Sequence, residues 1–434
     1  MSTANPSCDL LSIDKRQSML LMGMSELQSI TDSLAHSIQR PVTIDDVEMR
    51  LVSHSEQAGD IDDPRMASIL RRRVPERVVS WLRTLRIEEA TGPIRIPANP
   101  ELGTIPRVCV PIRCHGTLLG YLWVIDADSS LTPDDLALVN TAAEAAGNVL
   151  YRESLLAQLE RVRERELLRD LLSEQADVRR YAANELAKED MFTGAPAISV
   201  LVARPVLSTG RVWNDDVQLA VGETLDQLRK GRPLRKSLQL VRPDHAVFVA
   251  GLTDLKRGAD EAVALGRRLQ AALAERLADM GVEKLVVGVG DVQPSLIDVL
   301  LSYQQAQRAA RVAEVAATFG VVVAWSQLGI YQTLSHFPIE RLAADALHPG
   351  LVKLLQKPGQ DWLAQTLERY LDNSGDAKTT ASDLSLHRAS LYYRLRKIEE
   401  LANVDLRRGE DRLALHLGLK LARLAGIYVP KQED

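Results

Sequence analysis

Residues 383–401 read DLSLHRASLYYRLRKIEEL, and this stretch decides the fold of the C-terminal part of the chain. Leu391, Leu395 and Ile398 are spaced four and three residues apart, which predicts the apolar face of a helix. A similar apolar triplet precedes it: Ala377, Ala381 and Leu384. Residues 385–387 form a tight connection between the two. Two short helices joined by about three residues predict a helix-turn-helix.

The opposite side of the second helix is polar, basic and interleaved with tyrosines. At about 100° per residue, Ala389, Tyr393, Arg396 and Lys397 point away from Leu391. Between Ala377 and Ile398 there are five basic residues and one acidic residue, a net charge of +4 in a chain whose net charge is −5. Such a face is suited to contacts with DNA phosphates and with base edges in the major groove. The alternative is a helical hairpin whose basic face is only exposed to solvent. The residues expected to contact DNA are Lys378, Thr380, Ser385, His387, Arg388, Ala389, Ser390, Tyr392, Tyr393, Arg394, Arg396 and Lys397.

The composition of the 434 residues limits the class of protein and the number of domains. The chain is 46% hydrophobic and 26% charged, which is typical of a soluble protein with several domains. No apolar run approaches a membrane span. Its three cysteines favour a reducing cytoplasm over a disulfide framework. The expected fold class is multidomain α+β: a sensor domain, a middle domain and an all-α helix-turn-helix domain.

The N-terminal part predicts a loose segment at residues 1–18 and a domain at residues 19–150. A helix is expected to begin at Met19, two strands at 42–47 and 49–53 are expected to flank a tight turn, and residues 60–90 are expected to be helical. Further strands are expected at 92–96, 107–113 and 118–126, with a hairpin turn at residues 115–117. Thr132 and Pro133 have the pattern of a helix start.

That last helix is expected to be long and to link domains over residues 133–175. Val139, Ala142, Ala146 and Val149 follow one apolar stripe, and a shifted stripe follows at Leu155, Leu159 and Val162. A seam that drifts in this way is typical of a dimer stalk. A solvated helix packed on its own domain is equally consistent with the pattern.

A middle domain is expected at residues 195–325. Its periodicities predict the order β-α-β-β-α-β-α-β, with a hairpin about residues 242–245 and with the helices on one face of the sheet. Residues 326–370 form a helical bridge, and the helix-turn-helix domain occupies residues 371–430.

The quoted stretch resembles the C-terminal domain of PucR/CdaR-type bacterial transcription regulators. Residues 367–373 and 410–417 extend this resemblance. The family usually has Asn at position 389, Thr at 390 and often Arg at 392, where this chain has Ala389, Ser390 and Tyr392. An Asn–adenine contact is therefore absent at Ala389, and the base preference of relatives does not transfer.

The middle and N-terminal parts resemble the other domains of such regulators. Residues 285–290 and 301–306 are similar to a domain related to GGDEF-type nucleotide cyclases. An active cyclase needs carboxylates for metal ions and a Gly-rich turn, whereas the hairpin at 241–246 has one carboxylate and a proline. A structural or dimerising role is favoured. Residues 110–112 and 119–124 resemble a GAF-type sensor, which implies a pocket for a small effector whose lining residues are unknown.

Three smaller sequence patterns could indicate binding sites, but each also fits a purely structural role. Cys109, Cys114 and His115 could supply metal ligands, but cysteines five positions apart on a strand lie on opposite sides. Residues 71–73 are three arginines, expected to be a solvated helix face. Gly288 and Gly290 lack the third glycine of a dinucleotide site. We therefore expect no catalytic residues, metal or cofactor.

These features lead to one expected function and two alternatives. The expected protein is an effector-responsive, sequence-specific DNA-binding transcription regulator of a metabolic or developmental operon. It would be cytoplasmic, form a homodimer or higher homo-oligomer, and bind a double-stranded DNA operator and a small-molecule effector. The alternatives are a nucleotide-cyclase-related enzyme and a signalling adaptor that does not bind DNA.

Overall fold

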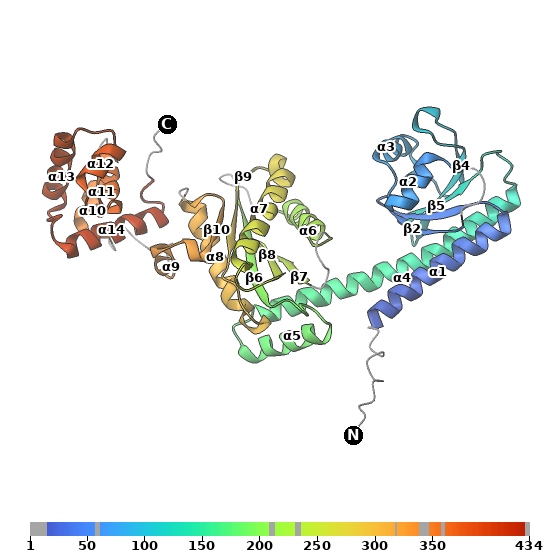
Figure 1. Cartoon of the computed structure of the whole chain (residues 1–434), viewed down its shortest axis with the longest axis horizontal. Coiled ribbons are helices and arrows are strands. Elements are labelled where there is room, and N and C mark those ends of the chain that lie inside the picture. The colour runs from blue at the N-terminus through green and yellow to red at the C-terminus, as the bar shows by residue number, and fades with distance from the viewer. Residues whose placement is uncertain are drawn as a thin grey trace, which may run out of the picture. The chain divides into compact units, whose positions relative to one another are not determined.

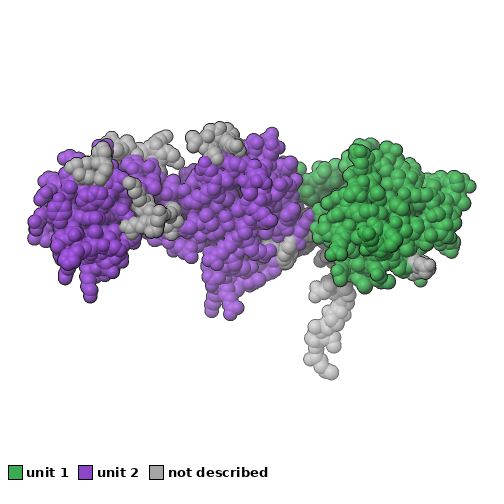
Figure 2. All heavy atoms as spheres, turned by 90° about the horizontal axis from the view of Figure 1, so that it is seen from above, with its two compact units in different colours: residues 1–162 green, residues 163–434 purple. Residues whose placement is uncertain are grey.

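The computed structural model describes residues 15–56, 61–207, 213–230, 236–316, 319–337, 347–356 and 361–429. The chain forms two compact units, residues 1–162 and 163–434 (Figure 2). The loose segment expected at residues 1–18 lies outside the described residues up to position 14. From Lys15 the chain is already helical, so the first helix begins four residues earlier than expected.

The first unit is built on a five-stranded antiparallel sheet in the order β2-β1-β5-β4-β3. Helices α1 (Lys15–Ile38) and α4 (Pro133–Leu171) cover one face of this sheet, while α2 (Asp63–Arg71) and α3 (Glu76–Thr84) lie over the other (Figure 1). The strands are β1 Val42–Asp46, β2 Leu51–His54, β3 Ile94–Ile96, β4 Arg107–Cys114 and β5 Thr117–Ile125.

Two local features of this unit test the sequence reading. The hairpin turn between β4 and β5 is confirmed, because His115 and Gly116 both have positive φ, 49° and 80°, as a two-residue hairpin turn requires. The expectation that residues 60–90 are helical holds for α2 and α3, but residues 72–75 between them are not helical. Arg72 adopts a left-handed conformation that ends α2, and Arg73 pairs with Arg50 beside β2. Residues 71–73 are exposed.

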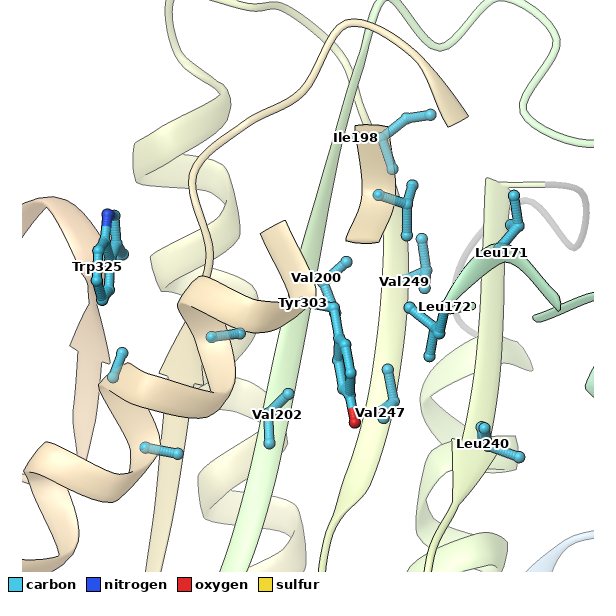
Figure 3. Close-up of a cluster of buried hydrophobic side chains, with 14 of the residues drawn as sticks. Leu171, Leu172, Ile198, Val200, Val202, Leu240, Val247, Val249, Tyr303 and Trp325 are labelled. Carbon is cyan, nitrogen blue, oxygen red and sulfur yellow. The ribbon is translucent and has the colours of Figure 1, made fainter. Parts of the chain in front are cut away.

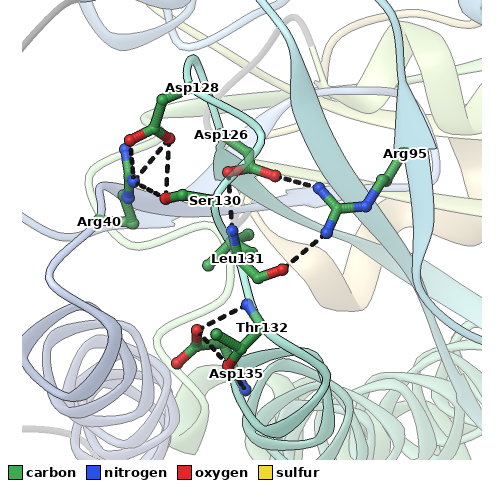
Figure 4. A network of polar contacts seen from close by, with 8 residues as sticks. All are labelled: Arg40, Arg95, Asp126, Asp128, Ser130, Leu131, Thr132 and Asp135. Atoms are coloured by element: carbon green, nitrogen blue, oxygen red, sulfur yellow. Dashed lines mark hydrogen bonds and ion pairs between the residues drawn. The ribbon is translucent and has the colours of Figure 1, made fainter.

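The start of α4 is held by a polar network (Figure 4). The Thr132 hydroxyl donates to Asp135 Oδ2 at 2.7 Å, and the Asp135 amide donates back to Thr132 Oγ1 at 3.2 Å. This exchange satisfies helix N-terminal groups, as the sequence predicts. Just before it, the Arg95 guanidinium bonds the Asp126 carboxylate and the Leu131 carbonyl. The network therefore ties β3 and the end of β5 to the first turn of α4.

The middle part of the second unit has the expected element order. Its sheet runs β10-β9-β6-β8-β7, with β10 parallel to β9 and the other pairs antiparallel. The elements in chain order are β6 Ala197–Leu207, α6 Asp215–Lys230, β7 Ser237–Val241, β8 Ala246–Leu252, α7 Gly258–Leu277, β9 Val282–Val289, α8 Val299–Val315 and β10 Val322–Ala324.

The expectation that helices cover one face of this sheet is wrong. Helices α6 and α7 bury one face around Leu201 and Phe248. Helix α8, the end of α4 and α5 (Ala176–Lys188), a helix the sequence reading missed, bury the other. Every residue of β8 is buried. A strand that is apolar on both sides needs cover on both sides.

The second of these cores surrounds Tyr303 (Figure 3). Figure 3 shows the Tyr303 side chain extending along the sheet beside Val202 and Val247, with Leu171 at the end of α4 and the following Leu172 nearby. Gly288 of β9 and Gly290 just after it let α8 approach, since a Cβ on either would lie 2.0 Å from a carbonyl oxygen of α8. These glycines therefore have a packing role.

The C-terminal part is all helical, and its helices share one core. The part of residues 326–370 that is described contains α9 (Ile330–Leu334) and two helices that belong to this core, while residues 338–346 and 357–360 of the expected bridge lie outside the description. A boundary at 371 therefore cuts through the packed domain. Its helices are α10 Pro349–Leu355, α11 Asp361–Asp372, α12 Ala377–Asp383, α13 Arg388–Ala402 and α14 Gly409–Leu424.

Candidate nucleic-acid interface

The two helices of the expected helix-turn-helix are α12 and α13, joined by residues 384–387. Asp376 caps α12, its carboxylate accepting from the Lys378 amide at 2.8 Å and from the Thr379 hydroxyl at 2.7 Å. These bonds, the Thr379 hydroxyl first, lower the pKa of Asp376. A charged cap at a helix N-terminus also complements the helix dipole.

The turn is a left-handed helix stop at Ser385, whose φ is 51°. The Leu386 amide donates to the Ala381 carbonyl at 2.8 Å, and the Ser385 amide donates to the Ser382 carbonyl at 3.1 Å. These two bonds form a Schellman motif, which satisfies the last carbonyls of α12. The motif sets the direction in which α13 leaves the turn.

Helix α13 has a buried side and an exposed side. Leu391, Leu395 and Ile398 are at most 6% exposed and lie in the core of the domain. Tyr392 and Tyr393 are 50% and 65% exposed, which is unusual for large aromatic side chains. The expected site residues that are exposed are Lys378, Ser385, His387, Arg388, Ala389, Ser390, Tyr392, Tyr393 and Arg396.

Thr380 is a correction to the expected interface. Its side chain is fully buried, and its hydroxyl donates to the Asp376 carbonyl at 2.6 Å and accepts from the Asn373 amide at 3.3 Å. The hydroxyl therefore stabilises the start of α12 and does not reach the surface. The sequence analysis expected Thr380 on the surface because the spacing of residues along α12 does not reveal which side of α12 packs against α11.

Arg394 and Lys397 lie at the edge of the expected face. The Arg394 guanidinium lies 4.8 Å from the ring centre of Trp362 and donates to Thr366 Oγ1 at 3.1 Å. Lys397 Nζ lies 5.3 Å from the same ring. Both cations thus pack on α11, and each is only partly exposed. The sequence analysis did not include Trp362 in the site. The basic residues Arg394 and Lys397, which pack on its ring, are the signal that could have pointed to it.

The expected cations that are exposed are Lys378, Arg388 and Arg396. The Arg388 guanidinium lies 5.9 Å from the ring centre of Tyr392, one helical turn further on. His387 caps α13, its Nδ1 lying 3.3 Å from the Ala389 amide. The first two turns of α13 therefore present basic and aromatic groups at a helix N-terminus, which itself attracts anions.

A buried ionic cluster holds α14 against α11. Glu368, 3% exposed, accepts from Lys420 at 3.2 Å and from Arg423 at 2.8 Å. Asp372 accepts from His416 at 2.7 Å and from Lys420 at 2.9 Å. Burial would raise the pKa of Asp372, but the bonds from His416 and Lys420 outweigh it and lower that pKa to about 2. These contacts fix the scaffold that carries α13.

The hairpin between β7 and β8 is closed by a polar chain. His245 Nδ1 lies 2.7 Å from Asp244 Oδ1, and its Nε2 lies 2.9 Å from the hydroxyl of Tyr303. Burial lowers the pKa of His245 despite the neighbouring Asp244. The one carboxylate of the hairpin is thus engaged with His245 and with Arg204 at 3.3 Å.

The first unit contains a small pocket between the sheet and helices α2 and α3. Asp45 of β1 and Trp123 of β5 line it, and each is 3% exposed. Asp45 Oδ1 and Trp123 Nε1 make no hydrogen bond of ideal geometry, but the Trp123 indole is near enough to Asp45 to lower its pKa, while burial, the larger effect, raises that pKa to about 7. Sequence reasoning missed both, since Thr43 and Asp45 alternate with the apolar Val42 and Ile44 in a way that also fits an exposed face. Buried polar atoms without partners are uncommon and need an explanation.

Cys109 and Cys114 do not converge. Cys109 is buried towards α3, whereas the Cys114 thiol lies 3.6 Å from Asn148 Oδ1 of α4. In the described part of the chain no group of three or more His, Cys, Asp or Glu residues is arranged to hold a metal ion. None of the described helices is both long and apolar enough to cross a membrane.

Three family models match the chain in succession. Residues 29–150 match the GAF domain, residues 196–312 match the GGDEF-like domain, and residues 363–421 match the PucR C-terminal helix-turn-helix domain. The last match begins in α11 and includes α12, α13 and most of α14. This range agrees with the packing, because α11 shares one hydrophobic core with α12 and α13.

Curated relatives match almost the whole chain. It is 24% identical to the DNA-binding transcriptional activator AdeR of Bacillus subtilis, over 92% of this chain and 93% of AdeR. It is 22% identical to the proline-responsive transcriptional activator PutR of the same organism, over 93% of this chain and 98% of PutR. A purine catabolism regulatory protein of that organism is 28% identical over 32% of this chain and 26% of its own length.

Among solved structures, the regulator of polyketide synthase expression from Bifidobacterium adolescentis matches 60% of this chain and 92% of its own. The sequence identity is 15% and the TM-score is 0.28. The assignment stands on the three domain matches and the full-length relatives. This chain is therefore a DNA-binding transcription regulator with a GAF domain, a GGDEF-like domain and a C-terminal domain that matches the PucR helix-turn-helix model.

Proposed function

We propose that this protein is an effector-responsive regulator that recognises specific operator sequences through the exposed side of α13. The observation that carries the proposal is the sidedness of that helix. Arg388, Tyr392, Tyr393 and Arg396 are exposed, while Leu391 and Leu395 anchor the opposite side. Phosphate contacts from the arginines would position the helix, and side chains of the first two turns would meet base edges. Binding to the chromosome implies that the protein acts in the bacterial cytoplasm.

Mapping of bound sites across the genome of the source bacterium, followed by fluorescence anisotropy on an enriched fragment, tests this proposal. We expect wild-type affinity to fall steeply as salt rises, because phosphate binding releases counterions. The double variant Arg388→Ala/Arg396→Ala should lose specific binding. A protein that enriches no fragment, or whose binding ignores salt, would instead support the adaptor alternative.

We propose that the protein binds DNA as a homodimer that uses α4. Leu155, Leu159 and Val162 are 46%, 59% and 48% exposed and are spaced four and three residues apart. This is the spacing of a coiled-coil seam. A second copy of the same helix is the occupant that matches such a stripe, and a dimer places two reading helices on two half-sites.

The pocket beside Asp45 is the effector site that we infer for the GAF domain. It lies between a sheet and covering helices and combines apolar walls with the buried polar groups of Asp45 and Trp123. One full-length relative is named as proline-responsive, which supports a small-molecule signal here. Binding of an effector would alter the packing of α2 and α3 on the sheet and so shift the populations of DNA-binding states.

Within the second unit, α14 offers a route from the middle domain to the reading helices. Leu424 lies in the core around Tyr303, and Leu417 and Leu421 pack against it. The same helix holds α11 through Glu368. A change in the packing of the middle domain would therefore act on the scaffold of α13.

We infer that the GGDEF-like domain has no cyclase activity. The single carboxylate of its hairpin is occupied by His245 and Arg204, and Pro243 stands where a phosphate-accommodating glycine would be needed. Incubation with labelled GTP or ATP and Mg²⁺ or Mn²⁺ tests this inference. Formation of a cyclic product would establish the enzyme alternative.

A further inference from the structure

The three consecutive arginines of the first unit do not form one face of a helix. Helix α2 ends at Arg71, Arg72 has a φ of 53°, and Arg73 forms an isolated bridge with Arg50 beside β2. The Arg72 carbonyl also accepts a backbone bond from β2 at 3.2 Å. The three side chains therefore leave the chain from three different backbone conformations, and all three are exposed.

The bridge between Arg50 and Arg73 places two positive charges opposite one another. Like charges at directly opposed positions of an antiparallel pair are destabilising. One carboxylate lies near each cation: Glu48 is 2.8 Å from Arg50, and Glu76 is 3.6 Å from Arg73. These carboxylates are 49% and 66% exposed, and ion pairs as exposed as these contribute little. A bound anion would therefore relieve a repulsion that the folded chain retains.

Three neighbouring cations lack even this compensation. Within the described residues, Arg71, Arg72 and Arg77 make no ion pair or side-chain hydrogen bond. Residues 65–86 contain seven arginines and one acidic residue, a net charge of +6 in a chain whose net charge is −5. Six of these seven arginines are exposed. We call the cluster the arginine surface; it consists of Arg50, Arg71, Arg72, Arg73 and Arg77.

The distribution of these charges favours a polyanion over a single small anion. The cations are spread over residues 50 and 71–77, so one phosphate or carboxylate would contact few of them. Duplex DNA carries about one negative charge per 1.7 Å of its axis, and a guanidinium binds a phosphate with two parallel hydrogen bonds. DNA is also the polyanion that this chain binds through its C-terminal domain. An acidic protein is the competing partner, and Leu70, which is 75% exposed beside Arg71, would then be part of the contact.

We propose that the arginine surface binds the phosphate backbone of DNA that flanks the operator. Its guanidiniums donate to phosphate oxygens, and such contacts carry no sequence information of their own. The proposal rests on the proposed function, since an operator held by α13 keeps its flanks at a high effective concentration near the rest of the chain. The first unit thus adds affinity for long DNA, while the choice of site stays with α13.

Counterion release provides a quantitative readout of this contact. Each phosphate that is neutralised steepens the slope of log K against log salt by about 0.9. Contacts from Arg71, Arg72 and Arg77 should therefore add a slope of about 3 per protomer, and only on fragments that extend beyond the operator. The advantage of a long fragment over a short one should consequently disappear as salt rises.

The experiment is fluorescence anisotropy of the full-length protein on two fragments that share one enriched site. One fragment is trimmed to the site, and the other carries flanks of about 60 base pairs, roughly 200 Å each, which exceeds the roughly 58 Å length of the 39-residue α4. At low salt the wild type should bind the extended fragment about tenfold more tightly or better. Arg71→Gln/Arg72→Gln/Arg77→Gln should bind both fragments alike, because the three charges are gone.

Three further variants serve as controls. Replacing the same three arginines by lysine should retain most of the advantage of the extended fragment, since an ammonium still binds phosphate as a point charge. Arg257→Gln/Arg267→Gln/Arg268→Gln removes equal charge from exposed positions of the second unit and should leave the advantage unchanged. Leu70→Ser should do the same, because phosphate binding needs no apolar contact.

The proposal is wrong if the wild type shows no advantage on the extended fragment, or if the triple glutamine variant of the arginine surface keeps that advantage. An equal loss in the glutamine control of the second unit would also overturn it, by showing a response to net charge alone. If the triple variant and Leu70→Ser both lower transcription from the operator while DNA binding is unchanged, the surface binds an acidic protein and the proposal fails.

A second background separates this proposal from the proposed function. If Arg388→Ala/Arg396→Ala binds the trimmed fragment as tightly as the wild type, operator recognition by α13 is wrong. In that same background, a long duplex of arbitrary sequence should still bind about tenfold more weakly once the three glutamines are added. If the added glutamines leave that binding unchanged, the arginine surface makes no contact with DNA, whatever reads the operator.

Discussion

Arg394 and Arg396 are two residues apart in α13, but their surroundings differ. Arg394 packs on Trp362 and bonds Thr366, so its guanidinium belongs to the interior edge of the domain. Arg396 is exposed. Each residue is therefore a control for the other, because one tests the scaffold and the other tests DNA contact.

If the Arg396 side chain contacts a base, Arg396→Ala should weaken operator binding by about 1–3 kcal/mol and relax the preference at that base. If the side chain contacts a phosphate, the variant should weaken binding to all DNA sequences by about the same amount. In the second case the slope of log K against log salt should fall by about one. Fluorescence anisotropy across a salt series measures both. Arg407→Ala, at a site 91% exposed and paired with Asp405 beyond the end of α13, should leave affinity unchanged; an equal loss there would mean that the effect is only one of net charge.

Arg394→Ala should loosen α13 against α11. The lost cation–aromatic contact and hydrogen bond together are worth about 1–2 kcal/mol, so amides of residues 361–402 should exchange roughly tenfold faster in hydrogen-exchange mass spectrometry. Arg396→Ala should leave exchange unchanged. Protection that is the same in both variants would show that the Trp362 contact adds nothing to the scaffold.

At the scale of elements, the turn between α12 and α13 carries a left-handed serine. A non-glycine residue in this conformation costs about 1 kcal/mol relative to glycine. Ser385→Gly should therefore slow exchange in residues 377–402 by a corresponding amount. Ser382→Gly, inside α12, should speed it instead, because glycine in a helix interior is unfavourable by roughly 0.5 kcal/mol relative to serine. Two changes of the same sign would argue against the Schellman turn.

The pair of helices α11 and α14 should be sensitive to acid through Asp372. Its pKa is about 2 in the folded protein, below the ordinary value of about 3.9, so its stabilising contribution is complete above about pH 4 and is lost as the pH falls towards 2. The side chain is partly exposed, which reduces the effect to the order of 1 kcal/mol. The stability difference between wild type and Asp372→Asn should thus shrink from about pH 6 to about pH 3, as measured by denaturant unfolding. A constant difference would contradict this assignment.

At the scale of the whole molecule, the exposed stripe of α4 should set the oligomeric state. Leu155→Arg/Leu159→Arg should convert a dimer to a monomer in sedimentation velocity and weaken operator binding, since two linked readers gain from effective concentration. Leu138→Arg is the matched control, because Leu138 is 47% exposed on another side of α4. A dimer that persists in the double variant would place the interface elsewhere.

Local patterns were sufficient for much of the architecture. The periodicity of α12 and α13, the start of α4 at Thr132, the His115 hairpin and the strand and helix order of residues 197–324 all depend on neighbours within a few residues. The same patterns were not sufficient for residues 60–90, where the left-handed Arg72 separates two helices. Nor did they indicate cover on both faces of the middle sheet, which depends on where α4 and α5 return in space.

The sequence by itself determined that the chain ends in a basic helix-turn-helix, because helical spacing, the turn and the charge surplus are all written within residues 377–398. Only the tertiary structure decided which of those residues are available. It buried Thr380 and turned Arg394 onto Trp362, through contacts with α11 that no spacing within α13 encodes. It also brought Asp45 and Trp123 together from separate strands. Burial and convergence are long-range properties of the packed chain, whereas helix periodicity and caps are local.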